Sequence, residues 1–183
     1  MHTIYKNLKG EEVPSVTTVL KVLNKPALVS WANSLGFKRQ SYKRELERTA
    51  KVGTLVHAYA EEKFNKKLFR DIKKAFELDD FSREQVLSAY NGFKMWLRDN
   101  VDLEVIASEK QLVSNKNKYG GTIDLIAKLG DETYIVDFKT SAKVHSTMFL
   151  QLAAYVYMAE ENGIKIDRVG IVRLSKNKGN YEF

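Results

Sequence analysis

The chain has 183 residues, 44% of them hydrophobic, and its 30 lysines and arginines outnumber its 23 aspartates and glutamates. This length is typical of one domain with its own core, so we expect a single domain over 1–183. The net charge of +7 favours a polyanionic partner. The absence of cysteine excludes disulfides, zinc thiolate sites and iron-sulfur clusters, so any metal must bind oxygen and nitrogen ligands. The sequence has no signal-peptide core and no apolar run of about 20 residues, which predicts a soluble, cytoplasmic protein without a membrane partner.

The first half of the chain has the periodicity of helices. Ser15 is placed to cap an amphipathic stripe over 16–23, and a second helical stripe follows over 28–35. A glycine-threonine pair at 53–54 is predicted to open a third helix, which continues to about Phe64.

The longest apolar stripe begins behind Ser82 and Gln85, which resemble a capping box, and extends to Leu97. From Leu103 the period changes to two, with many β-branched residues. Three strands are predicted over 103–113, 122–129 and 132–140, with separators at 119–121 and 130–131, followed by a helix over 147–161 and a strand over 168–174.

This order of elements predicts an α/β fold. We expect a central mixed sheet flanked by helices, with a helical part over about 14–99 and a sheet-bearing core over about 101–183.

The glycine-aspartate pair at 130–131 fits a two-residue hairpin loop, which fixes the register of the two strands around it. In that register Asp124 lies directly opposite Asp137, and Thr122 lies opposite Lys139, with all four side chains on one face. Opposed Cβ atoms are about 4.5 to 5.5 Å apart, and like charges so placed destabilise the pair unless something neutralises them. The facing aspartates therefore predict a divalent-cation site.

Two carboxylates suit Mg²⁺ or Mn²⁺, which bind through oxygen. Beside such an ion, Lys139 can orient or help deprotonate a water, and its ammonium can offset negative charge that develops on a phosphate. The alternative is that Asp124 and Asp137 are exposed hairpin charges with Lys139 as an ordinary salt-bridge partner. Each residue taken singly favours that alternative, and the combination favours a site.

Several segments in chain order resemble the PD-(D/E)XK nucleases, in the branch of RecB nuclease domains, phage-type exonucleases and the mitochondrial genome maintenance exonuclease. The resemblance extends through most of the chain. Its motifs are Pro14-Ser15-Val16-Thr17, Gly53-Thr54-Leu55-Val56-His57, Glu109, the G-x-x-D segment Gly121-Thr122-Ile123-Asp124, the D-x-K segment Val136-Asp137-Phe138-Lys139-Thr140-Ser141, and the Q-x-x-x-Y pair of Gln151 and Tyr155. One short motif carries little weight, but six in the right order are hard to obtain by chance.

The resemblance implies a set of metal ligands around the predicted hairpin. They are His57, Asp124, Asp137 and the backbone carbonyl of Phe138, with Lys139 assisting the water.

Two further assignments depend on the resemblance. Glu109 is implied to be a catalytic residue beside the metal, whereas strand alternation only places it on one face with Val105 and Ala107, which also fits an exposed strand end. A lone histidine on a helix is usually a surface or core residue, and His57 is preferred to His145 only through its motif.

The resemblance also gives Gln151 and Tyr155 a catalytic or DNA-contacting role, although a polar pair at this spacing is more often ordinary helix surface. The other residues expected to contact DNA are Ser15, Thr17, Lys116, Lys118, Thr140 and Lys143. Ser15 already has a structural explanation as a helix cap, and the basic run over 38–44 is of the kind that usually forms a solvated face.

We therefore expect a metal-dependent DNA nuclease, an exonuclease that favours single-stranded or frayed ends. A role in repair or recombination and a bacterial or phage origin fit the resemblance better than an organellar one. An endonuclease of the same fold is the nearest alternative, followed by a catalytically silent nucleic-acid-binding module and a basic interaction domain. A monomer is the default, and the sequence leaves open whether a further helix follows Phe183.

Overall fold

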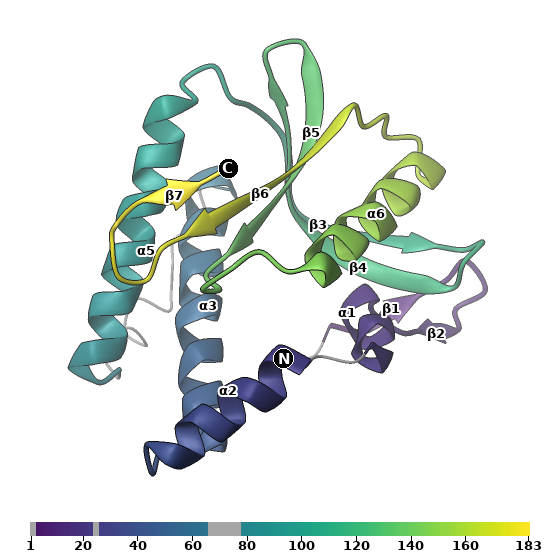
Figure 1. Cartoon of the computed structure of the whole chain (residues 1–183). Helices are drawn as coiled ribbons and strands as arrows, with labels where there is room; N and C mark the ends of the chain where they lie inside the picture. Colours follow the sequence, from purple (N-terminus) through teal and green to yellow (C-terminus); the bar gives the residue numbers. More distant parts are fainter. Residues whose placement is uncertain (1–2, 24–25, 66–77) are drawn as a thin grey trace.

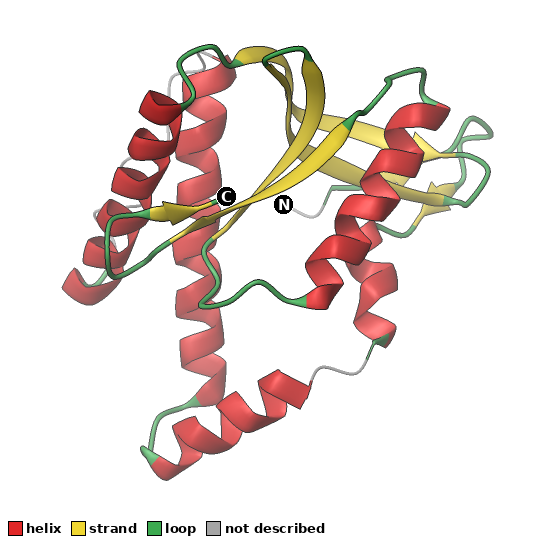
Figure 2. Cartoon of the chain, turned by 45° about the horizontal axis from the view of Figure 1, so that its top comes forward, coloured by secondary structure: helices red, strands yellow, loops and turns green. Residues whose placement is uncertain are grey.

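The computed structural model describes residues 3–23, 26–65 and 78–183, and it has a central sheet with helices on both faces (Figures 1 and 2). The helices are α1 (Val16–Val19), α2 (Pro26–Phe37), α3 (Tyr42–Asn65), α5 (Asp80–Asp99) and α6 (Ser146–Glu161), with a 3-10 turn, η1 (Leu20–Val22), after α1. The strands are β1 (Tyr5–Lys6), β2 (Glu12–Val13), β3 (Glu104–Ser114), β4 (Tyr119–Leu129), β5 (Glu132–Lys139), β6 (Arg168–Leu174) and β7 (Tyr181–Glu182). Strands β3 to β7 form one sheet in chain order, in which β5 and β6 are parallel and the other neighbours are antiparallel. The predicted α/β fold with a mixed sheet is confirmed.

The two faces of the sheet pack against different helices (Figure 2). On one face, the Phe138 ring of β5 lies edge-on to Phe93 and Trp96 of α5, with ring centroids 5.4 Å and 5.3 Å away. On the other face, Ile135 of the same strand is buried in a cluster with Leu152 of α6. Burying each such side chain stabilises the fold by about 1.5 to 3 kcal/mol. Because β5 is covered on both faces, a charged side chain within it must find a partner.

The register of the β4–β5 hairpin agrees with the prediction over the whole backbone ladder. Leu129 pairs with Glu132, and the ladder continues to the pairing of Leu125 with Val136. Gly130 has a φ of 62°, a left-handed conformation that glycine adopts without strain.

The predicted helix start at 53–54 is wrong, because α3 is continuous from Tyr42 to Asn65. The hydroxyl of Thr54 donates a hydrogen bond to the Ala50 carbonyl at 3.0 Å, so this residue is satisfied inside a helix. A Cβ on Gly53 would lie 3.5 Å from Oγ1 of Thr140, which places this turn of α3 against the end of β5. The glycine therefore marks a packing contact and not a helix boundary.

The helix start at Ser82 was also predicted three residues too late. Asp79 is the N-cap of α5, and its carboxylate accepts hydrogen bonds from the amide and the hydroxyl of Ser82, both at 2.9 Å. An N-cap aspartate satisfies free amides of the first turn and stabilises a helix by about 1 kcal/mol.

Two short pairings were missed in the sequence. The β1–β2 hairpin and strand β7 have two residues per strand, which is too short for an alternation to be recognised. The stripe over 16–23 is divided between α1 and η1, and β4 includes the residues at 119–121 that were predicted as a separator.

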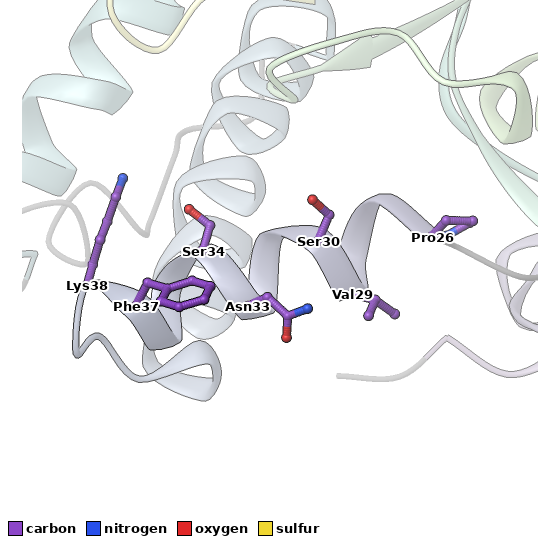
Figure 3. A pocket seen from close by; sticks show the side chains of 7 residues that line it. All are labelled: Pro26, Val29, Ser30, Asn33, Ser34, Phe37 and Lys38. Atoms are coloured by element: carbon purple, nitrogen blue, oxygen red, sulfur yellow. The ribbon is translucent and has the colours of Figure 1, made fainter.

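Helix α2 extends away from the sheet and packs at the base of α3, where the Trp31 and Tyr42 rings meet edge-on at 5.3 Å (Figure 1). A shallow groove runs along α2 between Val29 and Phe37 (Figure 3). Phe37 is 91% exposed. No helix in the described part of the chain, α2 included, combines the length and apolar character needed to cross a membrane.

The turn between β6 and β7 is held against α5. The Ser88 hydroxyl donates to the carbonyl of Ser175 at 3.0 Å and accepts from the amide of Gly179 at 2.8 Å. A Cβ on Gly92 would lie 2.5 Å from the backbone oxygen of Asn180, so α5 approaches this turn closely only because residue 92 is glycine.

We predict that Gly92→Ala destabilises the fold by about 1 to 3 kcal/mol, because the methyl group meets backbone that cannot rotate away. Gly36→Ala is the matched helical control, since nothing lies within 4 Å of its Cβ position. The control should leave stability unchanged or raise it by up to about 1 kcal/mol. Urea unfolding measures both, and a Gly92→Ala variant as stable as the control would contradict the close contact.

Candidate metal centre

Three side chains from different elements converge beside β5. His57 comes from α3, Glu109 from β3 and Asp124 from β4, and one ligand atom of each lies within 4.8 Å of the others. The Nδ1 atom of His57 is 3.4 Å from Oδ2 of Asp124. All three side chains are partly exposed, so solvent can reach them. An imidazole nitrogen with two carboxylates is a donor set that fits a hard divalent cation.

The Asp124 carboxylate accepts a backbone hydrogen bond just beyond the end of the β4–β5 ladder. The ladder stops at Leu125 and Val136, one position before Asp124 and Asp137. The amide of Phe138 instead donates to Oδ2 of Asp124 at 2.8 Å. This side-chain bond satisfies a buried amide, which allows the strands to separate at the site without an unpaired donor.

Glu109 reaches the cluster through an unusual backbone conformation. Its φ is 50°, in the left-handed region that costs a residue with a Cβ roughly 1 to 2 kcal/mol. The β3–β4 ladder pairs Ser108 with Leu125 and Lys110 with Ile123 on either side of it, and a register shift lies between Val105 and Ala107. The regular alternation assumed for this strand is therefore wrong, and the irregular backbone directs the Glu109 carboxylate toward the site.

Asp137 is buried, with 1% of its surface exposed. Its Oδ2 atom lies 2.5 Å from Nζ of Lys139, and Oδ1 has no hydrogen-bond partner in the part of the chain that the structure describes. Within that part, the three converging ligand atoms do not include one from Asp137. A buried carboxylate oxygen without a donor is costly unless a cation approaches it.

The charges of the cluster depend on one another. Burial, reinforced by the nearby Asp124 carboxylate, raises the pKa of Glu109 to about 7 and that of Asp137 to about 6. Burial also opposes charge on His57 and Asp124, but their mutual attraction outweighs it. The pKa of His57 therefore rises to about 9, and that of Asp124 falls below its usual range. A bound cation would displace protons from this cluster.

Gln151 and Tyr155 form a pair next to the cluster. The Gln151 side-chain amide donates to the Tyr155 hydroxyl at 2.8 Å, and Tyr155 is only 4% exposed. Burial raises the pKa of Tyr155, and the Asp124 and Asp137 carboxylates raise it further. A Cβ on Gly121 would lie 2.7 Å from the Tyr155 ring, so this glycine of the G-x-x-D segment makes room for the tyrosine. The interpretation of Tyr155 as ordinary helix surface is wrong.

Tyr5 is a neighbour of the site that the sequence analysis missed. Its hydroxyl shares a 2.8 Å hydrogen bond with Oγ1 of Thr122, and a Cβ on Gly120 would lie 2.4 Å from Cβ of Tyr5. The paired glycines were a usable signal, because adjacent glycines inside a strand indicate a close approach by another segment.

The remaining sequence candidates contribute no atom to the three-residue cluster, and Lys116 and Lys118 lie in the turn between β3 and β4. The Ser15 hydroxyl caps α1 by accepting from the Thr18 amide at 3.1 Å, and it also lies 2.9 Å from the Thr17 hydroxyl. Thr140 follows directly after Lys139 at the end of β5 and faces Gly53 of α3. Lys116, Lys118 and Lys143 are exposed.

The chain matches a family of known proteins. A family model described as the PD-(D/E)XK nuclease superfamily matches residues 30–180, which include His57, Glu109, Asp124, Asp137 and Lys139. No curated protein gives a significant match to the chain.

We predict that the metal-free protein loses stability as the pH rises, and that Glu109→Gln reduces this loss. A carboxyl with a raised folded pKa stabilises the fold below its unfolded pKa of 4.5, and this contribution disappears as the pH rises toward about 7. Thermal unfolding in chelator between about pH 5 and pH 8 measures the effect. Glu104→Gln, at an exposed position of the same strand, is the control. Parallel pH profiles for wild type and Glu109→Gln would contradict the burial of this carboxyl.

Proposed function

Because the chain belongs to the PD-(D/E)XK nuclease superfamily, we propose that it is a Mg²⁺- or Mn²⁺-dependent deoxyribonuclease, an exonuclease that favours single-stranded or frayed ends. The observation that carries the proposal is the convergence of His57, Glu109 and Asp124 on one point beside the ion pair of the buried Asp137 with the partly exposed Lys139. The motif order also supports a place in the branch of RecB nuclease domains and phage-type exonucleases.

The donor atoms fit a divalent cation. The proposed ligands are His57, Asp124, Asp137 and the backbone carbonyl of Phe138, and the position of Glu109 supports adding it to this set. The Oδ1 atom of Asp137, which is buried and has no hydrogen-bond partner among the described residues, is the observation that best fits a cation ligand. A bound metal would lower the pKa of a water molecule and would place positive charge beside the phosphate oxygens.

Lys139 is proposed to hold the attacking water and to offset charge on the phosphate. Its ammonium is 2.5 Å from Asp137, and its side chain is 20% exposed, so it can reach both the carboxylate and a substrate in solvent. A cation in this partly desolvated position stabilises developing negative charge more strongly than one in bulk water. Lys139 therefore acts through its charge and its position.

The Tyr155 hydroxyl is proposed to position the substrate. It is held by Gln151 and lies within the field of Asp124 and Asp137. Its raised pKa keeps the hydroxyl protonated, so it remains a hydrogen-bond donor for a phosphate oxygen.

The alternatives differ in what they require of the site. A silent binding module has no need of a partly buried lysine-aspartate pair next to a histidine and two further acids, since burying each of these charges costs desolvation energy. An endonuclease of the same fold needs the same centre and differs in how the strand enters it. The proposal of an end preference rests on the motif resemblance.

We predict that Asp137→Ala and Lys139→Ala each lower DNA cleavage by at least about 100-fold, because each removes a charged group that acts on the phosphate or the water. Adding Mg²⁺ or Mn²⁺ should raise the melting temperature of the wild type and of Lys139→Ala, but not that of Asp137→Ala. Labelled DNA and thermal unfolding with and without metal measure the two effects.

Lys128→Ala is the matched control, because this lysine is exposed on β4 near the opposite end of the hairpin. It should cleave at the wild-type rate. Wild-type turnover in Asp137→Ala or Lys139→Ala would refute their assigned roles, and a wild type that neither cleaves DNA nor responds to metal would support the silent module.

We predict that linear single-stranded DNA is degraded from its ends while circular single-stranded DNA of the same sequence survives. The substrates share every internal bond and differ only in the presence of ends. Cleavage of the circle at a rate comparable with that of the linear strand would replace the exonuclease proposal with the endonuclease.

A further inference from the structure

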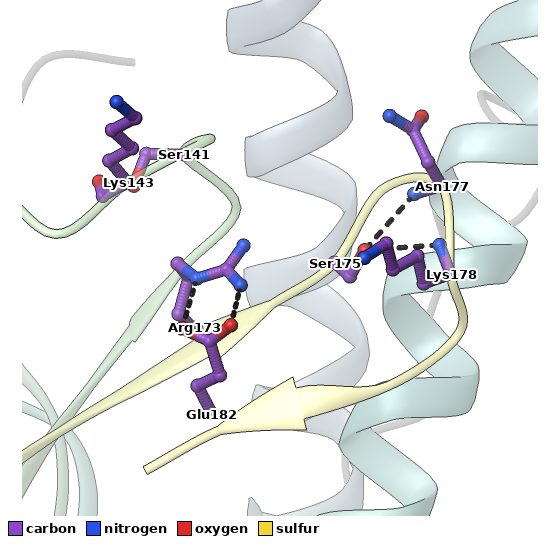
Figure 4. A network of polar contacts seen from close by, with 7 residues as sticks. All are labelled: Ser141, Lys143, Arg173, Ser175, Asn177, Lys178 and Glu182. Carbon is purple, nitrogen blue, oxygen red and sulfur yellow. Dashed lines mark hydrogen bonds and ion pairs between the residues drawn. The ribbon is translucent and has the colours of Figure 1, made fainter.

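A polar crevice lies beside the metal centre, between the segment that leaves β5 and the turn that joins β6 to β7. Thr140 to Ala142 line one side, and Ser175 to Lys178 line the other. Figure 4 shows Ser141 on one side and Ser175, Asn177 and Lys178 on the other, with the Arg173 and Glu182 pair between them. Because β5 and β6 are parallel, the crevice lies outside the carboxyl ends of adjacent strands, where open α/β sheets bind their ligands.

The β6–β7 side of the crevice is rigid. The Ser175 hydroxyl accepts from the amides of Asn177 and Lys178 at 3.3 Å and 3.0 Å, which closes the turn on itself. The Ser88 hydroxyl and the glycine at position 92 fix the same turn to α5. Lys176 is therefore presented from a fixed backbone.

Among the residues that the structure describes, Lys176 has no carboxylate partner. Burial lowers the pKa of its ammonium, and the nearby Arg48 guanidinium of α3 lowers it further. No carboxylate in the described part of the chain forms an ion pair with Lys176, whereas Arg48 is paired with Glu45 at 2.5 Å and Arg173 is paired with Glu182. Folded proteins rarely keep a half-buried cation beside another cation without an anion, since both desolvation and repulsion oppose it.

We propose that this crevice binds a backbone phosphate of the nucleic-acid strand, with Lys176 as the principal charge and the Thr140 to Ala142 segment as the opposite side. The inference rests on the proposed nuclease function and adds a second contact point for the substrate. A phosphate fits because it is an anion that is small enough to enter a polar crevice and can accept hydrogen bonds from hydroxyl and ammonium groups.

Helix α3 carries His57 at the candidate metal centre and Arg48, which is close enough to Lys176 to lower the pKa of its ammonium. His57 and Arg48 are nine residues apart on one helix, a rise of about 14 Å at about 1.5 Å per residue. At the spacing of one strand in a duplex, about 3.4 Å of rise per phosphate, that distance corresponds to about four nucleotides. Thr140, which borders the crevice, directly follows Lys139 of the centre. One nucleic-acid strand can therefore contact the candidate metal centre and the crevice at the same time.

The test is the affinity of the full chain for a fluorescent single-stranded oligonucleotide, measured by anisotropy in chelator so that no cleavage occurs. Lys176→Gln should weaken binding by about 5- to 10-fold and reduce the slope of log affinity against log salt by about 0.7, the value expected for one lost phosphate contact on a single strand. The matched control is Lys128→Gln, which removes the same charge from an exposed position. It should change binding by less than about twofold.

Two further variants separate binding from folding. Lys176→Arg keeps the charge and should retain wild-type binding, while Lys176→Met should bind as weakly as Lys176→Gln. The melting temperature of Lys176→Met should equal or exceed that of the wild type, because an unpaired half-buried cation is removed. Weak binding together with unreduced stability supports the phosphate site. A melting temperature that falls, with no loss of binding, assigns Lys176 a structural role and overturns it.

The outcomes distinguish this inference from the proposed function. If the wild type binds and cleaves DNA but Lys176→Gln behaves like Lys128→Gln, the crevice is not a phosphate site and the nuclease proposal stands. If the wild type binds no nucleic acid, both proposals fail.

Discussion

The hydrogen bond from the Phe138 amide to the Asp124 carboxylate is the interaction on which the proposed metal centre depends. It ends the backbone ladder between the two central strands without leaving a buried amide unpaired, and the unpaired amide alone would cost about 1 to 3 kcal/mol. The same Oδ2 atom faces the His57 ring. One carboxylate oxygen therefore links a strand, a helix and a binding site, and its depressed pKa keeps it charged for all three.

The residues of the proposed centre destabilise the fold, and packing in the surrounding core offsets this loss of stability. Glu109 has a left-handed backbone, and Asp137 is a buried carboxyl with one unpartnered oxygen. Aromatic packing around Phe138 on one face and the aliphatic cluster around Ile135 on the other hold the strands in place against this strain. Backbone strain and buried charge of this kind persist only where the rest of the structure fixes them, and they gather at functional sites.

The sequence identified most of the residues that gather at the centre but not their arrangement. The D-x-K and G-x-x-D segments led to Asp124, Asp137 and Lys139, and the hairpin register followed from a two-residue loop. The alternation of side chains along the strand did not predict that Glu109 faces the site. Its direction depends on an irregular backbone that no pattern of residue types reveals. Tyr5 was also missed, because it joins the site across 117 positions of sequence from Thr122.

Local chemistry therefore determined the order of the longer helices and strands, the mixed sheet, the hairpin register and the types of ligand atom available, since periodicity, turn residues and composition act over a few residues. Only the tertiary structure decided that α3 continues through Gly53, that Tyr155 is buried against Gly121, and that Lys176 lies within reach of the Arg48 charge. Each of these depends on a contact between segments far apart in the chain. Such contacts override local preferences because their packing energy exceeds the roughly 1 kcal/mol that a single helix or turn propensity supplies.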